Sequence, residues 1–240
     1  MLKTFSILLL LNLSLASCSS STPLPATFTP APLPTQLIVP PTLTATLVPS
    51  PTWTALPTST PEPLGCQRPP DDYTRVEVNG SILNQRTLAM LLHAQELYGG
   101  EIQLTGYAIT QGSYNMGVSA SFGTHDGGGA ADLSVLQQGT YTVLWDDIDP
   151  LLHALRAAGF AAWLREYGEL YADSPIHIHA IAIGDAELSP AAQEQLTGPA
   201  GYFRGYSGLP FPDGGAPTQD RYGGPILCQW MIELGYYDMR

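Results

Sequence analysis

Residues 123–132 read Gly-Thr-His-Asp-Gly-Gly-Gly-Ala-Ala-Asp, and residues 174–179 read Ser-Pro-Ile-His-Ile-His. Three of the five histidines in the chain fall in these two short stretches, and the first stretch ends on an aspartate. The three consecutive glycines accept positive φ and close backbone approach, so the chain after His125 can turn back sharply before a strand that begins at Ala130. Such a turn would aim His125 and Asp132 at one point.

The second stretch is typical of a strand, because residues 176–183 are rich in β-branched side chains. Residues two apart in a strand share a face, so we expect His177 and His179 to point the same way. Ile176 and Ile178 then face the opposite side. Two imidazoles on one face need partners, because a buried polar group without one costs about 1–3 kcal/mol.

Together the two stretches supply the ligand types that zinc prefers. A catalytic zinc ion takes three protein ligands from imidazole nitrogens and carboxylate oxygens and keeps a fourth position for water. The sequence therefore predicts a zinc site formed by His125, Asp132 and His179. One alternative is a tight glycine turn that His125 merely caps, and another is a strand edge that exposes His177 and His179 to water.

These residues resemble a known family. A His-x-x-Gly-x-Ala-x-Asp signature of the zinc D-Ala-D-Ala carboxypeptidase family is matched by His125, Gly128, Ala130 and Asp132. His177-Ile178-His179 is similar to the His-x-His of that family, and the order and separation of the motifs also agree over about residues 88–186. The family shares its fold with the Hedgehog signalling domain and with the lysostaphin-type endopeptidases. The latter place three residues between the first histidine and the aspartate, whereas six lie between them here, which favours the carboxypeptidase branch.

The resemblance implies an α+β fold of the Hedgehog/DD-peptidase type, in which helices flank a small antiparallel sheet. It implies that His125, Asp132 and His179 bind Zn²⁺ and that His177 assists catalysis beside the metal. The expected function is hydrolysis of peptidoglycan stem or crosslink peptides, most simply as a D-Ala-D-Ala carboxypeptidase with metal-bound water as nucleophile. The alternatives are a non-catalytic zinc module of the same fold that binds cell wall or a partner, and an adhesive surface lipoprotein without metal.

Two positions depart from the family pattern. Many members carry a Gly-Tyr-Arg-Ser segment whose arginine helps to hold the substrate, whereas this chain has Gly106-Tyr107-Ala108 and Gln111-Gly112-Ser113. Gly123 replaces the serine usually found two residues before the first ligand. Trp163 and Arg165 are candidates to wall the cleft and to replace that arginine, although core packing and a solvated charge are the simpler interpretations.

The amino-terminal part predicts export and anchoring. Residues 1–17 have one early lysine and then an apolar run, which is typical of a secretory signal. Leu15-Ala16-Ser17-Cys18 resembles a bacterial lipoprotein processing site, at which Cys18 is lipidated. The alternative is an ordinary signal peptide with a chance cysteine. Residues 18–65 are dominated by Pro, Thr, Ser and Ala and predict a disordered stalk. We expect an extracytoplasmic protein, held on the lipid bilayer of the cell membrane or cell surface by its acyl chain.

Residues 66–240 are predicted to form one metallopeptidase-like domain. Cys66 and Cys228 are the only cysteines besides Cys18, and an even pair in an exported protein predicts a disulfide. Two free buried thiols are the alternative. The net charge is −12 and the arginines form no cluster, which argues against nucleic-acid binding. We expect peptidoglycan peptides as partners and a monomeric protein.

Periodicity and capping signals predict the elements of this domain. Helices are expected over residues 84–98, from Asp149-Pro150 to Gly159, from Ser189-Pro190 onward and over residues 226–234. Strands are expected over residues 102–110, 160–165 and 176–183, the last two adjacent and antiparallel. His93 and His153 fall on two of the helices, and we interpret them as surface or packing residues.

Overall fold

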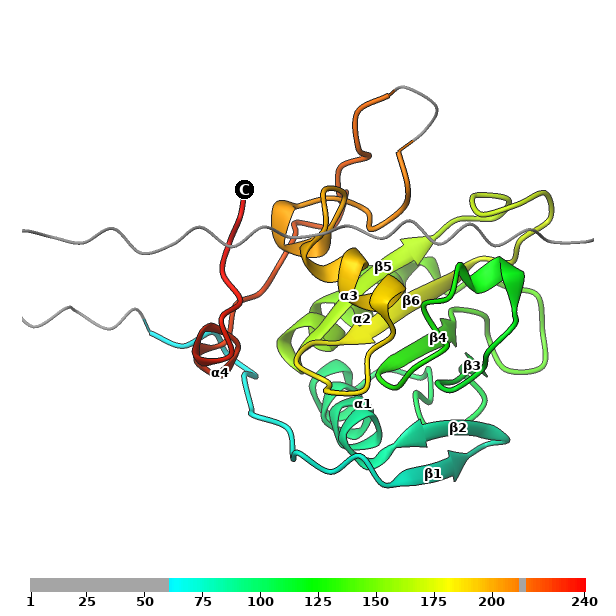
Figure 1. The fold of residues 1–240 in the computed structure, drawn as a ribbon. Helices are drawn as coiled ribbons and strands as arrows, with labels where there is room; N and C mark the ends of the chain where they lie inside the picture. The colour runs from blue at the N-terminus through cyan, green and yellow to red at the C-terminus, as the bar shows by residue number, and fades with distance from the viewer. Residues whose placement is uncertain (1–60, 212–214) are drawn as a thin grey trace, which may run out of the picture. The chain divides into compact units, whose positions relative to one another are not determined.

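A computed structural model of the chain describes residues 61–211 and 215–240 (Figure 1). All of the described residues belong to the unit Pro57–Arg240. The predicted signal peptide, the lipidated Cys18 and the stalk up to residue 60 lie outside the described residues. Within the described ranges no helix is both long enough and apolar enough to span a membrane.

A four-stranded antiparallel sheet forms the centre of the domain, with the strand order β3-β4-β6-β5. Its strands are β3 (Ile109–Gln111), β4 (Ala130–Ser134), β5 (Phe160–Arg165) and β6 (His177–Ala182). The central strand β6 pairs His179 with Asp132 on one side and with Trp163 on the other. Paired residues of neighbouring strands project from the same face, so these three side chains form one row across the sheet.

Helices cover both faces of this sheet. On one face, α1 (Gln85–Tyr98) and α2 (Trp145–Ala157) bury a core that includes Leu133, Leu164 and Ile178. The opposite face is covered by α3 (Pro190–Thr197), the 3₁₀ helix η2 (Tyr202–Arg204) and α4 (Gln229–Glu233). Figure 1 shows α3 lying against β5 and β6. The α+β class, with helices on both sides of a small antiparallel sheet, is confirmed.

A hairpin that the sequence analysis missed precedes α1. Its strands are β1 (Arg75–Val78) and β2 (Ser81–Asn84), which pair antiparallel. Asn79 and Gly80 connect them, and both have positive φ (47° and 79°). Asn-Gly is the preferred pair for a two-residue hairpin turn that needs positive φ at both positions. The Asn79-Gly80 dipeptide could therefore have predicted this hairpin from the sequence.

The predicted helices differ from the observed ones mainly at their ends. Asn84, the predicted first residue of the helix, is instead the cap of α1, and its side chain accepts a hydrogen bond of 2.8 Å from the backbone N–H of Thr87. The predicted start of α2 at Pro150 is wrong, since the helix begins at Trp145. Pro150 lies inside this helix, where it has no N–H to donate to the carbonyl four residues earlier, at Asp146. The last helix is shorter than predicted and begins at Gln229.

The strand predictions succeeded at β5 and β6 and failed upstream. Residues 160–165 form β5 throughout, and β6 is its antiparallel neighbour. The predicted strand over residues 102–110 is wrong for most of its length, because only the residues from Ile109 onward join the sheet. Ile102 and Leu104 are buried from a turn-rich loop instead. Their spacing reflects burial of loop side chains, which alternation alone does not separate from a strand.

The predicted disulfide is confirmed. Cys66 and Cys228 are bonded, with their Cα atoms 5.5 Å apart across a sequence separation of 162 residues. Cys228 is fully buried beside Trp230 and Met231 in the core under α4. The bond therefore joins the beginning of the domain to its last helix.

Candidate metal centre

The three predicted ligands meet on the α3 side of the sheet. His125 Nε2 lies 3.2 Å from Asp132 Oδ1 and 3.4 Å from His179 Nδ1, and His179 Nδ1 lies 2.7 Å from Asp132 Oδ1. Two ligands that each lie about 2.0–2.1 Å from a tetrahedral zinc ion are about 3.3 Å apart. The spacing of the three atoms therefore fits one small divalent ion.

His125 reaches this point because its loop packs tightly against the chain that precedes α3. The backbone N–H of Gly128 donates a hydrogen bond of 2.7 Å to Glu187 O. A Cβ atom on Gly127 would lie only 2.2 Å from the same carbonyl oxygen. Gly129 has a φ of 77°, a conformation that side-chain-bearing residues avoid. The glycine run thus allows the close approach and the reversal that bring His125 over β4.

The remaining nitrogens of both ligand imidazoles face amide oxygens. His125 Nδ1 lies 2.8 Å from Gly112 O, and His179 Nε2 lies 3.0 Å from Gln195 Oε1 on α3. An amide oxygen can only accept, so these two nitrogens carry the protons and the other nitrogens present lone pairs. Two lone pairs and a carboxylate thus converge, and a cation is needed to balance them. This donor set, with amide acceptors behind the histidines, fits zinc.

The pKa shifts of the three predicted ligands are consistent with a cation-binding site. Burial acts to raise the pKa of Asp132, but the close imidazoles of His125 and His179 outweigh it and hold that pKa far below its ordinary value. Burial lowers the pKa of His179 to about 4. Burial also acts to lower the pKa of His125, yet its hydrogen bond with Asp132 and the carboxylate charge raise it overall. Without metal, a proton on His125 balances the carboxylate, and a metal ion would displace it.

His177 lies beside the triad of His125, Asp132 and His179 but is not part of it. It projects from the same face of β6 as His179, and its Nε2 is 3.8 Å from Asp132 Oδ1, farther than either ligand nitrogen. Its Nδ1 lies 2.8 Å from Pro175 O, so Nδ1 carries the proton and Nε2 presents a lone pair to the site. The structure thus brings together all four predicted site residues, with His177 next to the three predicted ligands.

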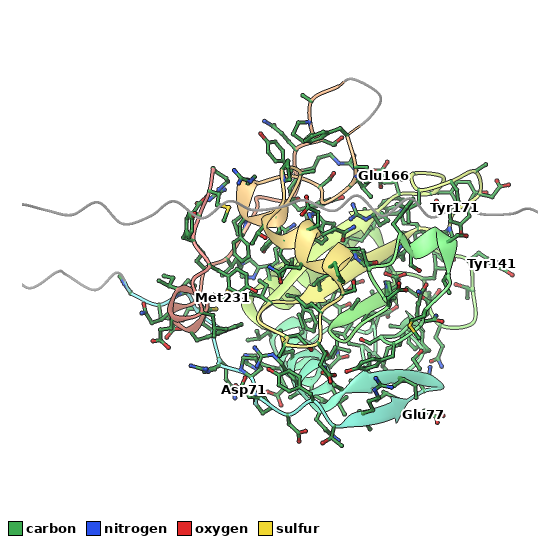
Figure 2. The ribbon with its side chains drawn as sticks, in the orientation of Figure 1. Asp71, Glu77, Tyr141, Glu166, Tyr171 and Met231 are labelled. Atoms are coloured by element: carbon green, nitrogen blue, oxygen red, sulfur yellow. A yellow bond between two sulfur atoms is a disulfide. The ribbon has the colours of Figure 1, made fainter. Side chains whose placement is uncertain are left out.

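The triad lies in the middle of a groove. A cavity of about 20 Å³ is lined by residues that include His125, Asp132, His179, His177 and Arg165. On one side it adjoins an apolar pocket of about 380 Å³ through the shared residues Phe122 and Leu209. On the other side it adjoins a more polar pocket of about 170 Å³. Tyr171 lines this second pocket from the loop between β5 and β6, at the edge of the domain in Figure 2.

Two further residues of β5 and one of α3 complete the surroundings. Trp163 is buried and stacks on His179, with ring centroids 6.1 Å apart and planes 14° apart. Arg165 is only 2 % exposed, so its interpretation as a solvated charge is wrong. Sequence reasoning did not select Gln195 at all. No local pattern marks it, since its contact with His179 depends on how α3 packs on the sheet.

One other group of potential ligands comes comparably close within the described ranges, namely Glu62, Cys66 and Cys228. Both cysteines are in the disulfide and are not free to bind a metal. Comparisons of the chain with protein-family models, with curated proteins and with solved structures found no match. The geometry of the groove is therefore the basis for inferring a function.

Proposed function

We propose that the protein is a zinc-dependent peptidase of the Hedgehog/DD-peptidase fold that hydrolyses peptidoglycan peptides, most simply as a D-Ala-D-Ala carboxypeptidase. The observation that carries this proposal is the convergence of His125, Asp132 and His179 in a groove with room on both sides. The same residues occupy the ligand positions of the carboxypeptidase signature. Peptidoglycan as the substrate rests on that resemblance, and the groove supports an extended, peptide-like ligand.

His125, Asp132 and His179 would hold the ion, with Gly112 O and Gln195 fixing the two imidazoles. A bound zinc ion supplies Lewis-acid activation of water and of the peptide carbonyl. His177 Nε2 presents a lone pair to the same cavity and lies within reach of a reacting group there. We assign to it the proton transfer from the attacking water to the leaving amine. In its protonated form it also stabilises negative charge on the carbonyl oxygen.

The proposed location is extracytoplasmic, with the domain anchored to a bilayer through an acyl chain on Cys18. The disulfide supports export, because such bonds persist in oxidising compartments. The acidic chain, with a net charge of −12, would gain nothing from anionic lipid headgroups, so the anchor would have to come from the acyl chain.

The test is release of D-Ala from a defined muropeptide pentapeptide by the purified, zinc-loaded protein. We expect chelator to abolish release and added zinc to restore it. His179→Ala should lose both metal and turnover, whereas His177→Ala should keep stoichiometric zinc and lose about 10²–10⁴-fold in kcat. His153→Ala, on the exposed side of α2, is the matched control and should behave as wild type. Release that survives chelator or His179→Ala would contradict the proposal.

A second function, a non-catalytic zinc module that binds cell wall, is favoured by one observation. The segments that resemble the arginine-bearing part of the family have Ala108 and Ser113 and no arginine. Such a protein would bind zinc stoichiometrically and hydrolyse no muropeptide. Elemental analysis together with the turnover assay separates the two functions, and an absence of bound metal would reject both.

A further inference from the structure

Arg165 is a buried cation on the same face of the sheet as the metal ligands. In the register of β5 and β6 it pairs with His177, so the two side chains project side by side. Its Nη1 donates a hydrogen bond of 2.8 Å to Ser207 O. Its Nη2 is buried and has no hydrogen-bond partner within the described ranges, and no carboxylate there comes within 4.0 Å of the guanidinium.

The other two buried arginines of the described chain each form an ion pair with a carboxylate, whereas Arg165 forms none. Arg156 donates to Asp220 at 2.7 Å, and Arg86 donates to Asp71 at 2.7 Å. Buried charges in proteins are normally paired, because removing an ion from water is costly. Burial lowers the pKa of Arg165 to about 10, although the charge of Glu169 acts to raise it. Arg165 therefore stays charged at neutral pH without a counter-ion in contact.

The position of Arg165 shows where a counter-ion would bind. Its side chain lines the small cavity that also contains the triad and His177. Arg165 also borders a second cavity along the outer edge of β5, with Glu166 and Asp220, but neither acid reaches it at ion-pair distance. An anionic group of a ligand in the central cavity would satisfy Nη2. It would lie next to the bond that the metal site acts on.

We propose that Arg165 binds the terminal carboxylate of the substrate and restricts cleavage to the bond beside a free carboxyl end. This inference rests on the proposed function and specifies its substrate class. A guanidinium matches a carboxylate because its planar N–H groups and its charge complement both oxygens. An internal peptide carbonyl would offer one neutral acceptor and would leave the buried charge unbalanced. Ser207 O, which holds Nη1, keeps the guanidinium oriented with Nη2 free.

The kinetic test uses two peptides that end in D-Ala-D-Ala and differ only in a terminal carboxylate or carboxamide. For the zinc-loaded full chain we expect kcat/KM to favour the carboxylate by about 10- to 100-fold, the size of one charge-assisted hydrogen bond. Arg165→Gln should abolish this preference, mainly through KM, and Arg165→Lys should keep part of it. Arg221→Gln is the control, because Arg221 is an exposed arginine paired with Glu166. A folded, zinc-bound Arg165→Gln protein with the full wild-type preference would overturn the inference.

A binding test separates failure of this inference from failure of the proposed function. Calorimetry would compare D-alanyl-D-alanine with its amide on the metal-free and the zinc-loaded full chain. We expect wild type to bind the acid at least about tenfold more tightly than the amide. Arg165→Gln should bind the acid and the amide with equal affinity. That result would support the role of Arg165 even if no peptide were hydrolysed. Equal binding of acid and amide by wild type would overturn it, whether or not the variants fold.

Discussion

Two residues that accept hydrogen bonds from the predicted histidine ligands should affect how tightly the site binds a metal ion. Gly112 O and Gln195 Oε1 accept from the far nitrogens of His125 and His179, and so fix both the ring orientation and the tautomer. Of the two, only Gln195 acts through a side chain. Its contribution can therefore be removed without changing a ligand.

Gln195→Ala should lower zinc affinity by about 10- to 100-fold, because His179 loses the acceptor that orients it. The Kd would be measured by competition with a chromophoric chelator. Gln193→Ala is the matched control, since Gln193 lies two residues away on α3 and bonds to Thr197 within the helix. Equal zinc affinity of the two variants would show that the contact with His179 is incidental.

The stability of the domain should respond differently to the loss of the charge of Arg165 and of Arg156. Arg156→Met leaves Asp220 buried without its partner and should destabilise the protein by about 3–5 kcal/mol. Arg165→Met removes a buried charge that has no carboxylate in contact. It should lower the free energy of unfolding far less than Arg156→Met, or even raise it. Chemical denaturation of the metal-free proteins would measure both. A loss at Arg165 as large as that at Arg156 would indicate a structural role.

Some residues of the candidate site can be predicted from a short stretch of sequence, and others cannot. His125 and Asp132 share one glycine-rich stretch and His177 and His179 share one strand, so spacing alone predicts their common direction. Gln195 and Arg165 touch this group through the packing of α3 and through the pairing of β5 with β6. Such contacts depend on residues distant in sequence, and they could not be predicted from a local pattern.

At the scale of elements, the loop between residues 123 and 129 is what brings His125 to the sheet. Its backbone lies against residues 187–189 so closely that no side chain fits at Gly127. The start of α3 at Ser189-Pro190 was predictable from its cap and its proline. The contact between this start and the glycine loop was not, because it forms only when the sheet is assembled.

Gly127→Ala should displace the loop and abolish zinc binding, because its Cβ would lie 2.2 Å from Glu187 O. Overpacking of this kind typically costs about 1–3 kcal/mol in stability. Gly139→Ala is the control: it has positive φ but no neighbour within 4 Å, so it should lose only stability and keep zinc. Elemental analysis and thermal unfolding would report the two effects separately. Full zinc occupancy in Gly127→Ala would contradict the role assigned to the loop.

For the whole molecule, the order of the central elements was more predictable than their limits. The paired strands β5 and β6 could be predicted because β5 is mostly apolar and residues 176–183 are rich in β-branched side chains. The segment 102–108 was mistaken for a strand because a buried loop shows a similar alternation. The hairpin before α1 was overlooked although its Asn-Gly turn is a strong signal. These errors lie outside the two stretches that carry the four predicted site residues, so the convergence of those residues could be predicted although part of the fold could not.

The Cys66–Cys228 bond should contribute a large part of the stability of the domain. Closing a loop of 162 residues is worth about 5 kcal/mol in the chain-entropy model, and removal of native disulfides typically costs 2–5 kcal/mol. The double variant Cys66→Ser/Cys228→Ser should therefore unfold about 5–20 °C lower. Its zinc content at a temperature where it remains folded should match wild type. An unchanged Tm would show that the covalent link is dispensable.

That bond also has a consequence for proteolysis of the domain. Since it joins the start of the domain to its last helix, a single cut in any intervening loop leaves both pieces covalently attached. Nicked molecules would migrate as intact protein until reductant is added, and they would keep the halves of the groove together. If the protein is anchored at the cell surface, as proposed, this covalent link would prevent one cleavage from releasing a fragment.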